Sequence, residues 1–146
     1  MKLKQLSLFL ENKPGALSRP VRVLARAKVN ILTLSIAEAN QFGILRLIVR
    51  DWEKVKTLLE KEGFVVKITD VVAVEVADRP GGLAKILNAL GKAGINVEFM
   101  YAFTEKRMNR GVLVFRFDNP DQAIRVLREK GINVVRSVDW LKQTKS

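Results

Sequence analysis

Asp78-Arg79-Pro80-Gly81-Gly82-Leu83 is the stretch that decides the fold, because its core occurs twice in the chain. Pro14-Gly15-Ala16-Leu17 stands 66 residues earlier, with the same proline, glycine and leucine. A second segment recurs at the same spacing: Ala27-Lys28-Val29-Asn30-Ile31 returns as Ala93-Gly94-Ile95-Asn96-Val97. Matches in separate segments at a fixed spacing indicate two copies of one supersecondary unit.

Two further glycines extend the repeat. Gly43 and Gly63 reappear as Gly111 and Gly131, now at a spacing of 68 residues. The second copy is longer before Gly111, where a basic connection is expected over residues 105–110. The repeat therefore covers almost the whole of each copy.

Each copy is predicted to fold as strand, helix, strand, strand, helix and strand. Before the first Pro-Gly turn, Leu6, Leu8 and Leu10 alternate with other residues, which is the period of a strand. After each turn, apolar residues recur every three or four positions, which is the period of a helix. The later strands are expected at 31–38, 44–50 and 64–69, and at 97–104, 111–118 and 133–137.

The second helix of each copy has clear end signals. Asn119-Pro120-Asp121-Gln122 offers an N-cap, a proline at the first helical position and a glutamine at the third. Gly131 is expected to end that helix. The segment from Asp51 to Gly63 follows the same scheme less fully.

The first helices of the two copies are expected to differ. Leu17, Val21 and Leu24 are predicted to face inward, as are their counterparts Leu83, Leu87 and Leu90. Pro20, however, stands where the second copy has Ile86. Proline lacks a backbone N–H, so the first helix either tolerates it in an early turn or starts late, with Ser18 as its cap.

The sheet faces predict a further contact surface. Leu45, Leu47 and Val49 match Leu113, Phe115 and Phe117 on the third strand, the face expected under the helices. On the second strand the apolar registers disagree, with Leu32, Leu34 and Ile36 in one copy and Val97, Phe99, Tyr101 and Phe103 in the other. Either a bulge shifts one strand or both sheet faces are covered. Self-association would cover the second face, so a homodimer is expected.

The repeat also predicts the domain boundaries: residues 1–69, residues 70–138, and a C-terminal tail over 139–146 in which Trp140 packs back onto the sheet or a partner. Thr69-Asp70-Val71 is too short to serve as a flexible linker, so the two copies are expected to pack closely.

Composition narrows the function. The chain has 146 residues, 48% of them hydrophobic, with neither cysteine nor histidine. Thiolate and imidazole catalysis and the usual zinc, copper and iron sites are therefore not expected, and no cofactor is predicted. No apolar stretch approaches the roughly 18–20 residues of a membrane span, so a cytoplasmic protein without a membrane partner is expected. The net charge of +11 is spread evenly over both copies and is interpreted as a solubilising surface.

The repeated turn has a direct physical interpretation. Asn12 and Asp78 can cap a helix or bond nearby backbone, and the glycine lets a ligand approach the main chain. The N–H groups of Gly15, Ala16 and Leu17, like those of Gly81, Gly82 and Leu83, are expected to be free at the positive end of a helix, which suits a carboxylate. Asn30 and Asn96 follow the helix, where an amide can serve an ammonium or a carboxylate.

Both copies resemble ACT domains, the small ligand-sensing modules of amino-acid metabolism. The similarity rests on Asp78-Arg79-Pro80-Gly81-Gly82-Leu83 and Gly94-Ile95-Asn96-Val97; the first copy departs from the pattern at Lys28. The resemblance implies an α+β fold of two tandem ferredoxin-like βαββαβ units, with antiparallel sheets side by side and helices on one face. It also implies amino-acid binding at the seams between units.

Carried over to matching positions, the resemblance gives a predicted set of ligand-binding residues in each copy. They are Asn12, Pro14, Gly15, Ala16, Leu17, Asn30 and Ile31 in the first, and Asp78, Pro80, Gly81, Gly82, Leu83, Asn96 and Val97 in the second. Asp78 adds a negative charge where Asn12 is neutral, so unequal affinities are predicted. The alternative is that these polar residues serve only as caps and turn contacts.

Three other functions are weighed against the sensor. Residues 10–19 locally resemble the small subunits of acetohydroxyacid synthase, which makes a regulatory subunit the main alternative and an enzyme or regulator a candidate partner. Residues 110–117 faintly echo an RNA-recognition motif, but Val112 and Val114 stand where stacking aromatics are needed, so nucleic-acid binding is not expected. No catalytic constellation is present, and an enzyme is not expected.

Overall fold

The computed structural model describes residues 1–103 and 110–138. The described chain divides into two compact units: the first is Lys4–Thr69, and the second combines Met1–Leu3 with the chain from Asp70 onward. Trp140, the rest of the predicted tail and most of the predicted basic connection lie outside the described residues. Each unit is α+β, and both follow the predicted order strand, helix, strand, strand and helix, but only the first unit has the predicted final strand.

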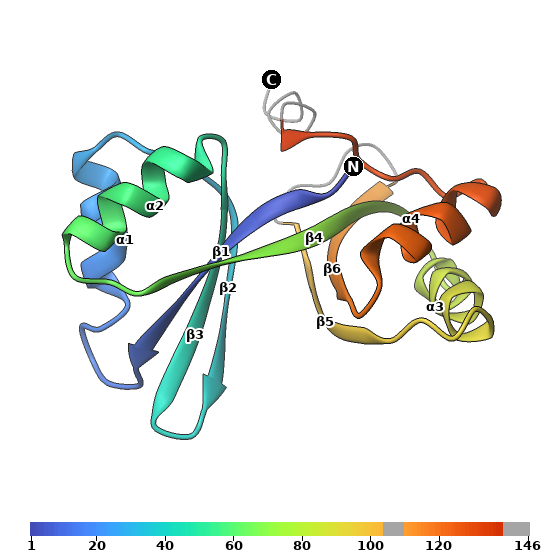
Figure 1. Ribbon diagram of the computed structural model, residues 1–146. Coiled ribbons are helices and arrows are strands. Elements are labelled where there is room, and N and C mark those ends of the chain that lie inside the picture. Colours follow the sequence, from blue (N-terminus) through green and yellow to red (C-terminus); the bar gives the residue numbers. More distant parts are fainter. Residues whose placement is uncertain (104–109, 139–146) are drawn as a thin grey trace. The chain divides into compact units, whose positions relative to one another are not determined.

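The first unit contains the elements β1 to α2 and the start of β4 (Figure 1). Their bounds are β1 (Leu3–Glu11), α1 (Ser18–Arg26), β2 (Ile31–Ala39), β3 (Phe42–Val49), α2 (Trp52–Lys61) and β4 (Val66–Ala77). The strand order is β2-β3-β1-β4, and β3 pairs antiparallel with both β1 and β2. The helices α1 and α2 lie together on one face, over a core that includes Leu24, Leu45, Leu47 and Leu59.

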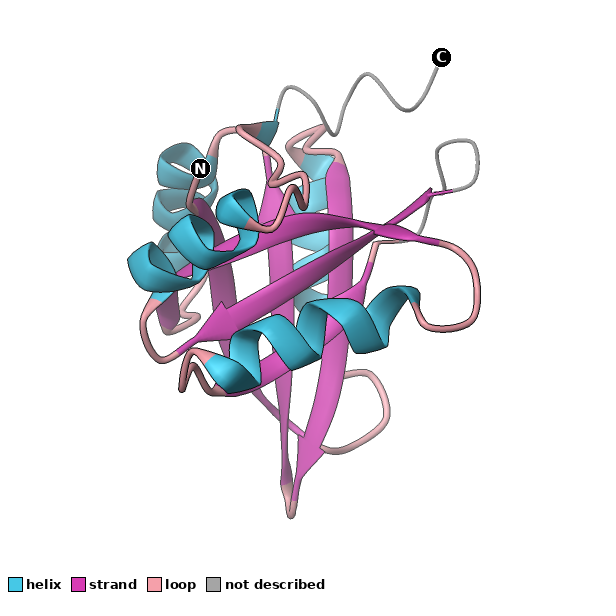
Figure 2. Cartoon of the chain, turned by 90° about the vertical axis from the view of Figure 1, so that its right-hand side faces the viewer, coloured by secondary structure: helices cyan, strands magenta, loops and turns pink. Residues whose placement is uncertain are grey.

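The second unit repeats this plan with the remaining elements. They are α3 (Gly82–Lys92), β5 (Val97–Ala102), β6 (Arg110–Phe117) and α4 (Pro120–Glu129). β6 pairs antiparallel with β4 and with β5, and short loops join the helices and strands (Figure 2). Phe115 and Phe117 stack with ring centroids 5.2 Å apart and lie under Ile86, Leu90 and Leu127. The predicted helix-facing side of the third strand is confirmed in both units.

β4 is one uninterrupted strand where the sequence predicts two strands and a connection. It runs from Val66 to Ala77, so Thr69-Asp70-Val71 is not a connection between two strands but the middle of one strand. This part of the prediction is wrong. Its physical reason is that residues 66–77 contain no glycine or proline and are rich in β-branched side chains, so nothing ends the strand.

The strand predicted at 133–137 is also wrong. The segment makes only one isolated bridge, between Val134 and Val74. Two backbone hydrogen bonds hold it: the Glu75 N–H donates to the Asn133 carbonyl (2.9 Å) and the Val135 N–H to the Ala73 carbonyl (2.8 Å). Only Val134 and Val135 form a buried apolar segment here, because charged Arg136 follows them.

The first helices differ as Pro20 suggests, but Ser18 does not have the expected role of a cap. α1 starts late, at Ser18, which makes Pro20 its third residue, and Pro20 is buried like its counterpart Ile86. Ser18 is not the cap: its hydroxyl donates to the Gly15 carbonyl (2.9 Å), and α1 receives no side-chain cap. Leu17, Leu83 and Leu87, predicted to face inward, are each more than a third exposed. Pro20 and Ile86 occupy the buried stripe instead.

A bulge in one strand does not explain the disagreement between the apolar registers of the second strands, because both strands have the same bulge and place their apolar side chains on different faces of the sheet. The pairing shifts between Ile31 and Thr33 in the first unit and between Val97 and Phe99 in the second. After the bulge, Leu34 pairs with Leu47 of the helix-covered face, whereas Tyr101 pairs with Val114 of the opposite face. None of the described helices is long and apolar enough to cross a membrane.

Candidate functional site

The two Pro-Gly turns have the same backbone conformation at their glycine. Gly15 has φ +86° and Gly81 has φ +88°, the left-handed region that favours glycine. In the part of the chain that the structure describes, neither glycine N–H has a hydrogen-bond acceptor. Both remain available to a ligand at the start of a helix.

The next amide in each turn is already used. The Ala16 N–H donates to the Lys13 carbonyl (3.3 Å), and the Gly82 N–H to the Arg79 carbonyl (3.1 Å). The expectation that these two groups are free is therefore wrong. Each amide closes a tight turn, which fixes the backbone orientation of the glycine before it.

The two turns differ in the residue at the position of Gly82. A β-carbon added to Gly82 would collide with the Ala77 carbonyl oxygen, so only glycine fits there. The first unit has Ala16 at this position. Gly82 allows this close approach, and α3 begins at Gly82 directly after its N-cap Gly81, whereas α1 begins only at Ser18. The repeated motif therefore builds two related but unequal turns.

A pocket of about 600 Å³ adjoins the first turn. It lies between the end of β1, the start of α1 and the loop that joins α2 to β4. Its lining residues are Phe9, Leu10, Glu11, Lys13, Pro14, Gly15, Ala16, Ser18, Arg19, Arg22, Gly63, Phe64 and Val65.

A smaller pocket of about 290 Å³ adjoins the second turn. Its lining residues are Glu75, Val76, Ala77, Arg79, Pro80, Gly81, Gly82, Lys85, Ile86, Arg110, Gly131, Ile132 and Asn133. Most of them are the repeat counterparts of the first set: Pro14 corresponds to Pro80, Arg19 to Lys85 and Phe64 to Ile132. The same part of each unit thus forms a pocket.

Both pockets carry excess positive charge. In the first, Lys13 pairs with Glu11 at 2.8 Å, and the hydrogen bond and charge of Lys13 hold the pKa of Glu11 below its ordinary value of 4.5. Arg19 and Arg22 add two further cations. In the second, Arg110 lies 3.7 Å from Glu75, while Arg79 and Lys85 add positive charge. An anionic group is the natural ligand of such linings.

Asn12 and Asp78 do not cap the helices that follow them. The N-caps are Leu17 and Gly81, and neither helix receives a side-chain cap. Asn12 instead donates from Nδ2 to the Asn40 carbonyl (3.4 Å), while its backbone N–H donates to the Gln41 carbonyl (2.8 Å). Asn12 thereby fastens the end of β1 to the β2–β3 turn. The capping role considered for these residues is not what the structure has.

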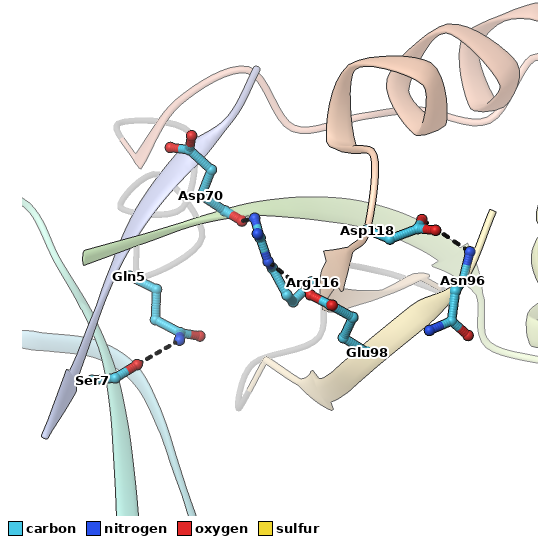
Figure 3. Close-up of polar contacts among 7 residues, drawn as sticks. All are labelled: Gln5, Ser7, Asp70, Asn96, Glu98, Arg116 and Asp118. Carbon is cyan, nitrogen blue, oxygen red and sulfur yellow. Dashed lines mark hydrogen bonds and ion pairs between the residues drawn. The ribbon is translucent and has the colours of Figure 1, made fainter. Parts of the chain in front are cut away.

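Asn96 is held by its backbone (Figure 3). Its N–H donates to Asp118 Oδ1 (3.0 Å), and the Asp118 N–H donates to the Asn96 carbonyl (3.2 Å). The Asn96 side-chain amide points away from Asp118. The first unit has Arg50 at the repeat position of Asp118, so Asn30 lacks this carboxylate.

The pockets bring together only part of the predicted set. Pro14, Gly15, Ala16, Pro80, Gly81 and Gly82 line them. The remaining predicted residues are outside the two described linings: Asn12, Leu17, Asn30, Ile31, Asp78, Leu83, Asn96 and Val97. Sequence reasoning missed Arg19, Arg22 and Phe64 in the first unit. The repeated Gly63 and Gly131, which precede Phe64 and Ile132, were the available signal.

The fold and the repeated turns match a known family. The model of the ACT domain pair matches residues 1–143. The chain belongs to the ACT domain pair family. Its fold is that of two tandem ferredoxin-like ACT domains, with the strand order β2-β3-β1-β4 in the first and β6 between β4 and β5 in the second.

Solved structures agree with this assignment. This ACT domain pair is 44% identical to protein BT0572 from Bacteroides thetaiotaomicron, with a TM-score of 0.86 over 92% of each chain. It also shares the fold of the regulatory subunit of aspartate kinase from Thermus thermophilus, at 16% identity, with a TM-score of 0.64 over 86% of this chain and 91% of that one. No curated protein sequence matches the chain.

Proposed function

We propose that this ACT domain pair is a non-catalytic regulatory protein that binds an amino acid at the Pro-Gly turn of each unit. The observation that carries the proposal is the pair of pockets at equivalent positions, each lined by the same repeated turn. A cavity that recurs where the sequence recurs is what a duplicated binding module would retain. The pockets' excess of cations supports an anionic ligand group.

The turn offers complementary groups for both ends of an amino acid. The free N–H groups of Gly15 and Gly81, with the nearby cations, suit a carboxylate. Glu11 in the first lining and Glu75 in the second are the acidic residues of the two pockets, and a bound ammonium would share them with Lys13 and Arg110. Asp78 follows the second strand end, where Asn12 stands in the first, and this difference still predicts unequal affinities.

A thermal-shift screen of the full chain against the twenty amino acids tests the proposal. A ligand at a hundred times its dissociation constant should stabilise the protein by about 2.7 kcal/mol. Arg19→Met and Lys85→Met each remove one pocket cation and should reduce the shift. Lys54→Met, on α2 and outside both linings, should leave it unchanged. If no amino acid shifts the melting temperature, the proposal fails.

A regulatory subunit for a separate enzyme is the second candidate. The regulatory subunit of aspartate kinase has this fold, which makes control of another chain a reasonable role by analogy. Co-purification of a stoichiometric enzyme subunit with the tagged protein would favour it over a free-standing sensor. Nucleic-acid binding has less support, because Val112 and Val114 are both buried and cannot stack on bases.

A further inference from the structure

The pocket beside the first turn differs from its counterpart in the shape of the groups that line it. Arg19 and Phe64 stand where the second unit has Lys85 and Ile132. The Arg19 guanidinium lies over the Phe64 ring, 5.0 Å from its centroid. A flat cation on a flat ring forms a planar surface that lysine and isoleucine cannot reproduce.

The same pocket contains two arginines that can bind an anion. Among the described residues, neither Arg19 nor Arg22 has a carboxylate partner, and Arg22 donates only to Ser18 Oγ (3.1 Å). Glu11, the single acidic residue of the lining, is paired with Lys13 at 2.8 Å. A guanidinium in this state binds a carboxylate through two parallel hydrogen bonds. At the repeat position of Arg22 the second unit has Asn88.

We infer that the pocket of the first unit selects carboxylates that carry an aromatic ring, and that the pocket of the second unit does not. The inference rests on the proposed function and names the ligand class of the first pocket. The carboxylate binds Arg22 and the Gly15 N–H, and the ring lies against the Arg19–Phe64 stack. The volume of about 600 Å³ falls within the roughly 300–1,000 Å³ of small-molecule pockets.

Isothermal titration calorimetry on the full chain with four probes separates the contributions. Phenylalanine has the ring, the carboxylate and the ammonium; phenylacetate lacks the ammonium, leucine lacks the ring and phenethylamine lacks the carboxylate. Phenylalanine and phenylacetate should bind. Leucine should bind about three- to tenfold more weakly than phenylalanine, because it lacks the stacking contact. Phenethylamine should show no binding.

Two substitutions give the first unit the residues that stand at the repeat positions of the second. Phe64→Ile should weaken phenylalanine binding to the level of leucine, while leucine itself is unaffected. Arg22→Asn should weaken phenylalanine, phenylacetate and leucine alike, by about tenfold. Two matched controls, Phe42→Ile and Arg26→Asn, alter exposed side chains outside the lining and should change no affinity.

Phe64 packs partly against the core of its unit, so the melting temperature of Phe64→Ile must be measured first. Arg22 is exposed and outside that core, and it keeps the test decisive if Phe64→Ile unfolds. Amino-acid binding without preference for the ring, or with affinities untouched by these substitutions, overturns the inference and leaves the proposed function intact. Absence of binding by all probes and all twenty amino acids overturns both. Binding of phenylacetate without any amino acid supports the aromatic pocket and overturns amino-acid sensing.

Discussion

Gly82 shows how one hydrogen atom in place of a methyl group changes a turn. Its α-carbon approaches the Ala77 carbonyl so closely that no side chain fits, and α3 begins there. Ala16, at the same repeat position, carries a β-carbon, and α1 begins later. The two turns thus differ at this position, although both keep a left-handed glycine before it.

The tightness at Gly82 gives a stability prediction. Gly82→Ala should lower the free energy of unfolding by about 1–3 kcal/mol, because the methyl group must displace backbone. Gly91, in the same helix, has nothing within 4 Å of an added β-carbon. Gly91→Ala is therefore the control and should raise the free energy of unfolding by about 0.4–1 kcal/mol. Urea unfolding checks both values, and equal effects of the two substitutions would contradict this account.

Among the elements, α1 and α3 carry the same buried stripe from different starting points. Pro20 is the third residue of α1, where the N–H has no helical acceptor, so its ring costs nothing. Ile86 is the fifth residue of α3, where the helix requires an N–H donor. The two helices are aligned by their buried residues and not by their first turns.

This difference in starting point predicts unequal tolerance of proline. Ile86→Pro should destabilise the protein by at least about 3 kcal/mol, through the lost hydrogen bond and the clash with the preceding turn. The reciprocal Pro20→Ile restores a backbone donor at a position that does not use one, and should cost less than about 1.5 kcal/mol. Chemical denaturation of both variants measures the contrast. Similar losses in the two would show that α1 and α3 share a start after all.

Local sequence signals predicted which helices and strands form better than they predicted where these elements begin and end. Asn119 caps α4 by accepting a hydrogen bond from the Gln122 N–H (3.2 Å), and Gly131 follows the helix with φ +72°. Both were evident from residue types alone. The strand at 133–137 was not settled by its residues, because a strand needs a partner of sufficient length, and partners are set by distant parts of the chain.

For the whole molecule, the repeat predicted the number of units and the location of the turns. It did not predict the far wall of each pocket. Phe64 and Ile132 follow the second helices and reach the turns only through the fold, over a sequence separation of about fifty residues. The repeat also did not predict that Thr69-Asp70-Val71 lies inside a strand, because a repeat boundary in sequence need not interrupt a strand.

The continuous strand β4 predicts how the whole chain unfolds. β4 runs through Thr69 and Asp70, where one unit ends and the other begins, so it supplies a strand to each. Loss of β4 from one unit removes hydrogen-bonded backbone that extends directly into the other, and we therefore expect one cooperative transition in urea. Insertion of Gly-Ser-Gly between Thr69 and Asp70 should break the strand and separate the transition into two. Circular dichroism and hydrogen exchange, followed over the same urea series, measure whether the units unfold together. Two separate transitions in the unaltered chain would show that β4 does not couple them.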